Sequence, residues 1–133
     1  MTAADTSLVI AAFASWHERH DAARRALDGG MRLIEHCALE TYSVLTRLPA
    51  PHRAGGEVVR EFLKARFPQP FLRLSAEAFR NFLSALPDRA VSGGAAYDAL
   101  VAATAADHDA ELVSCDRRAA VIYERYRVRT HLL

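Results

Sequence analysis

Short strand-like segments alternate along this chain with longer segments whose apolar residues recur at helical spacing. Strands are expected at residues 2–4, 31–35, 71–74, 111–114 and 128–130, and helices at 8–13, 17–27, 39–48, 57–67, 76–86, 95–107 and 117–126. Because strands and helices alternate in this order, the pattern predicts an α/β fold with a parallel sheet. We expect a three-layer domain in which four or five short strands carry helices on both faces.

Turn-forming residues separate these segments. Gly29-Gly30 ends the second helix, Pro49 and Pro51 stop the third, and Gly93-Gly94 precedes an alanine-rich helix. Residues 49–56 are expected to form a flexible connection, but no linker is long enough to separate two domains. The length of 133 residues, with 51% hydrophobic and 25% charged residues, is typical of one globular domain. We therefore expect a single domain over residues 1–133.

The cysteines and the N-terminal segment bear on the cellular compartment of the protein. Cys37 and Cys115 are too few for a disulfide framework, and no basic leader followed by an apolar run opens the sequence. No uninterrupted apolar stretch reaches the ~20 residues that a membrane helix needs. We expect a cytoplasmic protein without a membrane segment.

The balance of charges limits how the chain can contact nucleic acid. A net charge of +1 excludes a protein that coats nucleic acid through its whole surface, so any RNA contact must be local. Lys64 is the only lysine, and the guanidinium groups of the remaining cations suit bidentate contacts to phosphate, although a high genomic GC content explains the same bias more simply. Arg117 and Arg118 are the candidates for such contacts, because they directly follow an acidic strand end.

Four carboxylates are placed where parallel sheets usually bind ligands, at the carboxyl ends of the strands. Asp5 follows the first expected strand, Glu40 lies in the helix after the second, and Asp116 ends the buried segment 112–116. Asp98 lies in the first turn of the alanine-rich helix. Taken singly, each has a structural explanation as a helix cap or a solvated helix residue. Their joint placement is what points to a site.

A cluster of carboxylates repels itself unless a cation binds or some groups are protonated. Mg²⁺ prefers oxygen ligands and is usually held by one or two carboxylates with waters and substrate phosphate, and Mn²⁺ can take its place. We assign Asp5 and Asp98 as primary metal ligands, Asp116 as a ligand directly or through water, and Glu40 as a ligand or water-orienting base. Three neighbouring hydroxyl side chains are expected to support the site by hydrogen bonding: Thr6, Ser7 and Ser114.

Four segments resemble, in their order and spacing, the motifs of the PIN domain: Ala4–Ile10, Leu39–Leu45, Tyr97–Ala105 and Leu112–Arg118. Together they extend over nearly the whole chain. At this length the chain is similar to the VapC toxins of bacterial toxin-antitoxin pairs. Each motif is weak alone, whereas four in register are fairly specific.

The resemblance carries the family's acidic positions onto Asp5, Glu40, Asp98 and Asp116. The family's frequent Thr-x-Asp is met here by Ser114-Cys115-Asp116, in which serine keeps the hydroxyl. The chain departs from the family in its first strand, where Thr2-Ala3-Ala4 replaces the bulky β-branched residues that are usual there.

The resemblance also implies an activity and partners. It implies a magnesium-dependent endoribonuclease that hydrolyses phosphodiester bonds in structured RNA, inhibited by a small antitoxin whose tail would occupy the acidic groove. It further implies a homodimer, for which exposed helix faces such as Leu45 and Leu48 would supply a symmetric contact.

Two other functions stay open at this point. A PIN-like fold without hydrolytic activity would serve as an RNA- or protein-binding module, although the four intact acids argue against it. An aspartate-phosphorylated receiver domain is also small, α/β and acidic, but Lys64 lies in a central helix away from the strand ends. Stabilisation by Mg²⁺ or Mn²⁺ would distinguish a metalloenzyme from a module that only binds.

Other polar and aromatic residues carry weaker signals. His17 and His20 share a helix face but lack further ligands at zinc spacing. The segment Asp107-His108-Asp109 fits a solvated turn better than a ligand cluster. Three aromatic residues are candidates for facing RNA bases: Trp16, Tyr42 and Phe62. Aromatic residues at helical spacing are more often core or subunit-contact residues.

Overall fold

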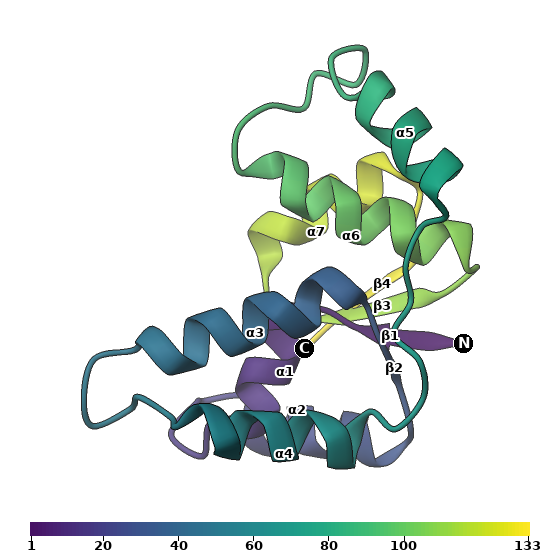
Figure 1. Ribbon diagram of the computed structural model, residues 1–133. Coiled ribbons are helices and arrows are strands. Elements are labelled where there is room, and N and C mark those ends of the chain that lie inside the picture. The colour runs from purple at the N-terminus through teal and green to yellow at the C-terminus, as the bar shows by residue number, and fades with distance from the viewer.

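The computed structural model describes all residues 1–133, and its centre is a four-stranded parallel sheet (Figure 1). Strand β1 (Thr2–Ala4) lies between β2 (Arg32–Leu33) and β3 (Glu111–Ser114), and β4 (Thr130–Leu132) pairs with the other side of β3. Because all strands run in the same direction, their carboxyl ends meet at one edge. The segments that follow β1, β2 and β3 are thereby neighbours.

Seven helices cover the two faces of this sheet (Figure 1). One layer holds α1 (Thr6–Phe13), α2 (His20–Asp28), α3 (Glu35–Arg47) and α4 (Gly56–Arg66), and the other holds α5 (Ala76–Ala85), α6 (Ala95–Asp107) and α7 (Arg117–Arg125). Helix α1 packs against α2 and α3, whereas α6 packs against α7. The expected three-layer α/β fold is confirmed. No helix has the length and apolarity that crossing a membrane requires.

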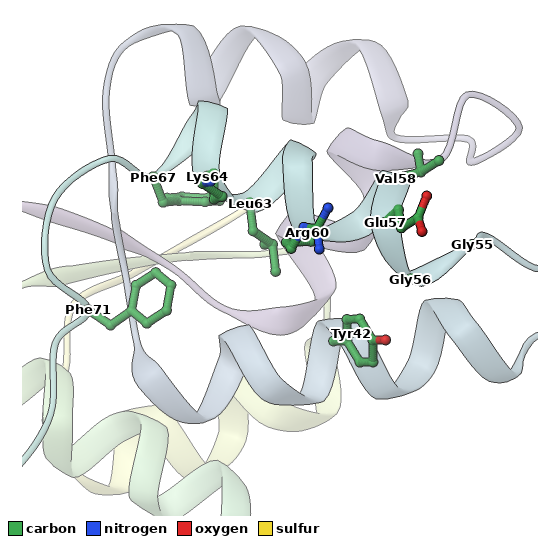
Figure 2. A pocket seen from close by; sticks show the side chains of 10 residues that line it. All are labelled: Tyr42, Gly55, Gly56, Glu57, Val58, Arg60, Leu63, Lys64, Phe67 and Phe71. Carbon is green, nitrogen blue, oxygen red and sulfur yellow. The ribbon is translucent and has the colours of Figure 1, made fainter.

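A hollow of about 710 Å³ lies between α3 and α4 (Figure 2). The connection between these helices folds back on α3, since the Ala54 amide donates to the Leu45 carbonyl at 3.0 Å. Helix α4 then begins beside the ring of Tyr42, where a Cβ on Gly56 would collide with the phenol. A larger residue at the start of α4 would have to displace the Tyr42 ring.

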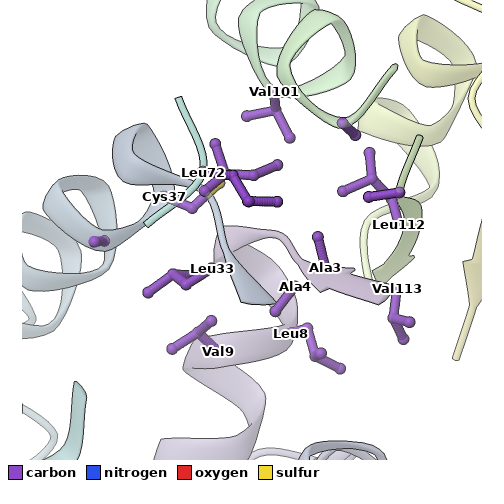
Figure 3. Close-up of a cluster of buried hydrophobic side chains, with 14 of the residues drawn as sticks. Ala3, Ala4, Leu8, Val9, Leu33, Cys37, Leu72, Val101, Leu112 and Val113 are labelled. Carbon is purple, nitrogen blue, oxygen red and sulfur yellow. The ribbon is translucent and has the colours of Figure 1, made fainter. Parts of the chain in front are cut away.

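The main hydrophobic core lies on both sides of β1 (Figure 3). Ala3 and Ala4 are fully buried, with Val101 of α6 on one side of the strands and Leu8 and Val9 of α1 on the other. The backbone of β1 is hydrogen-bonded to the strands on either side, and large apolar side chains from the helices fill the space beside its alanines. The small residues of this segment thus form a strand despite their low strand propensity.

Helix starts differ from the expectation in two places. Helix α2 begins at His20 instead of residue 17, because a turn precedes it in which the Arg19 amide donates to Nδ1 of His17 at 3.0 Å. Helix α3 begins at Glu35 instead of residue 39, and the expected strand 31–35 is correspondingly reduced to Arg32–Leu33. Pairing with β1 ends at Leu33, and Ile34 is bridged to Leu72 on the other side before α3 begins at Glu35.

Two expected strands also change. Segment 71–74 forms a single parallel bridge, between Leu72 and Ile34, at the edge beyond β2. The last strand starts at Thr130 instead of residue 128, because Arg127 adopts a φ of 59° and Val128 donates to the Tyr123 carbonyl, which prolongs the turn after α7.

The expected dimer contact through Leu45 is wrong. Leu45 is fully buried within the chain, because the face of α3 that carries it packs against α1 and α4. Leu48 is half-buried at the end of the same helix. The most exposed large hydrophobic residue of α3 is instead Leu39, whose relative exposure is 71%.

Candidate active site

Asp5, Glu40, Asp98 and Asp116 line one pocket of about 40 Å³. Asp5 follows β1 and Asp116 follows β3, so the parallel sheet brings them to the same edge. Glu40 reaches the pocket from the sixth position of α3, and Asp98 from the first turn of α6. The four acids predicted from the sequence are therefore brought together by the fold.

Asp5 is almost completely buried and is held by three donors. Its Oδ1 accepts hydrogen bonds from the Ser7 hydroxyl at 2.7 Å and the Leu8 amide at 3.0 Å, and its Oδ2 accepts from the Tyr123 hydroxyl at 3.0 Å. Burial raises the pKa of Asp5, while these donors lower it and so oppose the effect of burial. Asp5 thus both caps α1 and lines the pocket.

A relay of serine hydroxyls joins the ends of β1 and β3. Ser7 Oγ donates to Asp5, accepts from the Cys115 amide at 2.8 Å, and lies 3.2 Å from Ser114 Oγ. Since the Ser7 proton is used on Asp5, Ser114 must be the donor to Ser7, and Ser114 itself accepts from the Asp116 amide at 3.0 Å. The relay fixes the two strand ends relative to each other.

Asp98 and Asp116 face the pocket with more exposure to solvent than Asp5 has. Asp116 caps α7, and its Oδ1 accepts from the amides of Arg118 and Ala119 at 2.9 and 3.2 Å. Burial raises the pKa of Asp98, and the charges of Asp116, Glu40 and Asp5 raise it further. This repulsion is what a cation in the pocket would relieve.

Glu40 has the opposite electrostatic balance. Nε2 of His36, one turn earlier on α3, lies 3.6 Å from Oε2 of Glu40 and lowers the pKa of this carboxyl. His36 also lines the pocket, and its ring stacks on that of Tyr97. His36 thus favours the ionised form of Glu40, whereas the neighbours of Asp98 favour its protonated form.

A divalent cation such as Mg²⁺ requires oxygen ligands from the protein, from water or from substrate phosphate. No group of three or more histidine, cysteine, aspartate or glutamate side chains has the geometry to hold an ion by itself. The pocket nevertheless offers four carboxylates and the hydroxyl of Thr6, a buried group without a hydrogen-bond partner. Such a set fits a hard cation that keeps part of its water shell.

The other residues singled out from the sequence fall at different places. Arg117 and Arg118 are exposed at the start of α7. The positive charge of Arg118 partly offsets the rise in the pKa of Asp98. Tyr42 lines the hollow between α3 and α4 (Figure 2). Two further aromatic residues also lie outside the pocket: Trp16 contacts His52 with the two rings tilted, and Phe62 packs edge-on against Phe13.

Besides the apolar Val101 and Ala119, three ring-bearing residues of the pocket were not predicted from the sequence: His36, Tyr97 and Tyr123. His36 lies four residues before Glu40, and Tyr123 lies seven residues after Asp116, spacings that place side chains on one helix face. Tyr97 directly precedes Asp98. The helical spacing was therefore a usable signal for two of them.

Comparison with protein families and curated proteins agrees with this arrangement. The model of the PIN domain matches residues 3–125. The chain is 48% identical over 133 residues to Ribonuclease VapC40 of Mycobacterium tuberculosis, covering 100% of this chain and 99% of that protein. It is 39% identical over 132 residues to Ribonuclease VapC27 of the same species, covering 95% and 92% of the two chains.

Solved structures share the fold at low sequence identity. FitAcB from Neisseria gonorrhoeae superposes with a TM-score of 0.68 at 18% identity, covering 98% of this chain and 96% of that one. FitAB bound to the IR36 DNA fragment gives a TM-score of 0.73 at 16% identity, covering 99% and 94%. With the domain match over most of its length and two curated relatives above one-third identity, this chain belongs to the PIN-domain family, among its VapC-type toxins.

Proposed function

We propose that this protein is a metal-dependent endoribonuclease toxin that hydrolyses phosphodiester bonds in structured RNA. The observation that carries the proposal is the convergence of Asp5, Glu40, Asp98 and Asp116 on one pocket at the carboxyl edge of the sheet. The two curated relatives bear the name ribonuclease, which agrees with this chemistry.

Asp5 and Asp98 are the proposed primary ligands of Mg²⁺, for which Mn²⁺ can substitute, and Asp116 would bind directly or through water. Because no three acids form a closed set, one or two direct carboxylate contacts and several waters are expected, as is usual for Mg²⁺. The bound cation would supply Lewis acidity to the scissile phosphate and to the attacking water.

The protein side chains divide the remaining work among them. Glu40, kept ionised by His36, orients the water and can accept its proton on a carboxylate oxygen. The serine relay and Tyr123 hold Asp5 in one orientation. Arg117 and Arg118 bind flanking phosphates of the RNA.

Two partners belong to the proposal. The first is a small antitoxin whose arginine-bearing tail lies at the mouth of the acidic pocket and competes with the cation for the carboxylates. The second is another copy of this chain. Leu39 of α3 and Phe79 of α5 are exposed and line a groove of about 500 Å³, an apolar surface suited to a symmetric contact.

Cleavage of cellular RNA by the purified protein tests the activity. We expect discrete fragments with Mg²⁺ or Mn²⁺, none with a chelator, and none from Asp98→Asn. Asp107→Asn, which alters an exposed acid at the far end of α6, is the matched control and should cleave as wild type does. Absence of cleavage together with absence of metal binding would support a binding module instead.

A further inference from the structure

Tyr97 presents an open aromatic surface at the acidic pocket. Its ring is stacked on the imidazole of His36, with ring centroids 5.3 Å apart and an angle of 8° between the planes. The side chain is 59% exposed although it lines the pocket beside Asp98. His36 is largely covered and comes from α3, so it fixes the ring of α6 from behind.

The size of the pocket decides which part of a nucleotide can enter it. The cavity volume of about 40 Å³ is only a few times the roughly 10–15 Å³ that one water needs, so it holds no more than a few waters. A hydrated ion and phosphate oxygens can reach the carboxylates only from its mouth, and a nucleobase must stay outside. Of the pocket's three aromatic rings, Tyr123 is buried and His36 is covered by Tyr97, which leaves Tyr97 as the exposed one.

We propose that Tyr97, supported by His36, is the stacking platform for the base of the nucleotide next to the scissile phosphate. The inference rests on the proposed ribonuclease function and adds a substrate requirement to it. Aromatic side chains stack on bases that are unpaired and splayed out, and they do so with little preference among the four bases. The platform therefore selects an unpaired nucleotide, as in a loop, and not a particular sequence.

Kinetics of Tyr97 variants on a single-stranded oligonucleotide test the inference. Tyr97→Ala and Tyr97→Leu should raise KM about tenfold, whereas Tyr97→Phe, which keeps the ring, should stay near wild type. The turnover number should change little in all three, because the carboxylates are untouched. Tyr42→Ala removes a comparably exposed tyrosine outside the pocket and should leave KM unchanged.

Fluorescence provides a readout that does not require cleavage. A 2-aminopurine placed beside the cleavage position should be quenched on binding to wild type and to Tyr97→Phe, and markedly less on binding to Tyr97→Leu. The oligomeric state of each variant is measured in parallel. Metal affinity should be equal in all of them.

The outcomes separate the two proposals. If wild type cleaves RNA, KM is unchanged in Tyr97→Ala and quenching is unchanged in Tyr97→Leu, then Tyr97 is not a stacking platform. The proposed ribonuclease function is unaffected by that result. A changed oligomeric state in Tyr97→Ala, with KM unaffected, would assign the ring to a contact between subunits. Wild-type protein that neither cleaves nor binds RNA overturns the proposed function, and this inference with it.

Discussion

The hydroxyl of Tyr123 donates a hydrogen bond to Oδ2 of Asp5 across 3.0 Å, although 118 residues separate the two along the chain. Both side chains are buried, so the bond links the last turn of α7 to the end of β1 away from solvent. Burial raises the pKa of Tyr123, and the charge of Asp5 raises it further, so the phenol stays protonated and remains a donor. The contact therefore fixes the orientation of a proposed metal ligand.

Tyr123→Phe should weaken metal binding and RNA cleavage by about 10- to 100-fold, the usual effect of removing a group that orients a ligand. Calorimetric titration with Mn²⁺ and initial cleavage rates measure the two effects. Tyr126→Phe is the matched control, since the Tyr126 hydroxyl is buried without a hydrogen-bond partner. Equal metal affinity in Tyr123→Phe and wild type would show that Asp5 is oriented by its other donors alone.

Divalent metal should stabilise the folded chain, because binding to the native state alone raises the free energy of unfolding. At a Mg²⁺ or Mn²⁺ concentration about a hundred times Kd, the expected gain is about 2.7 kcal/mol. Thermal unfolding with and without metal measures it. The gain should be lost in Asp98→Asn and kept in Asp107→Asn, and a melting temperature indifferent to metal would contradict the metal site.

The acidic pocket was predictable from sequence because parallel strands end at one edge of the sheet, so Asp5 and Asp116 had to be neighbours. The partners on helices were harder to predict. His36 and Tyr123 follow from helical spacing only once Glu40 and Asp116 are known to face the pocket, because tertiary packing sets the rotation of α3 and α7 about their axes. The same reason explains Leu45: its apolar character fits a dimer contact as well as the core, and only the packing of α3 on α1 and α4 distinguishes them.

Leu39→Glu should convert the proposed homodimer to a monomer. The substitution places a charge on the apolar groove shared with Phe79, and burying an unpaired charge in a contact is costly. Light scattering after size-exclusion chromatography gives the mass. Val121→Glu, at an exposed position of α7, should leave the mass unchanged. A monomeric wild type would refute the dimer.

Ser7→Ala should destabilise the fold by about 1–3 kcal/mol, because the Cys115 amide and the Ser114 hydroxyl lose their shared acceptor. Urea unfolding measures the change, with Ser84→Ala on the exposed side of α5 as the control. A loss no larger than that of the control would mean that water replaces the serine hydroxyl in the relay.

The stability of the metal-free protein should depend on pH through Asp98. Its folded-state pKa lies above the ordinary value of 3.8, first because of burial and then because of the charges of Asp116, Glu40 and Asp5. Between the two values the folded state keeps a proton that the unfolded state has released, so the free energy of unfolding falls as pH rises through this window. Above this window Asp98 is ionised in the folded state, and the free energy of unfolding is lowered by the full cost of that ionisation. Asp98→Asn removes that cost.

In the presence of a chelator, Asp98→Asn should therefore be more stable than wild type at neutral pH. The difference should vanish below the ordinary pKa of 3.8, where Asp98 is protonated in both states. Part of the pH dependence should persist in the variant, because burial also raises the pKa of Asp5. Urea unfolding over this pH range measures both curves. Parallel curves for the two proteins would contradict the repulsion among the acids, and with it the physical reason for a cation in this pocket.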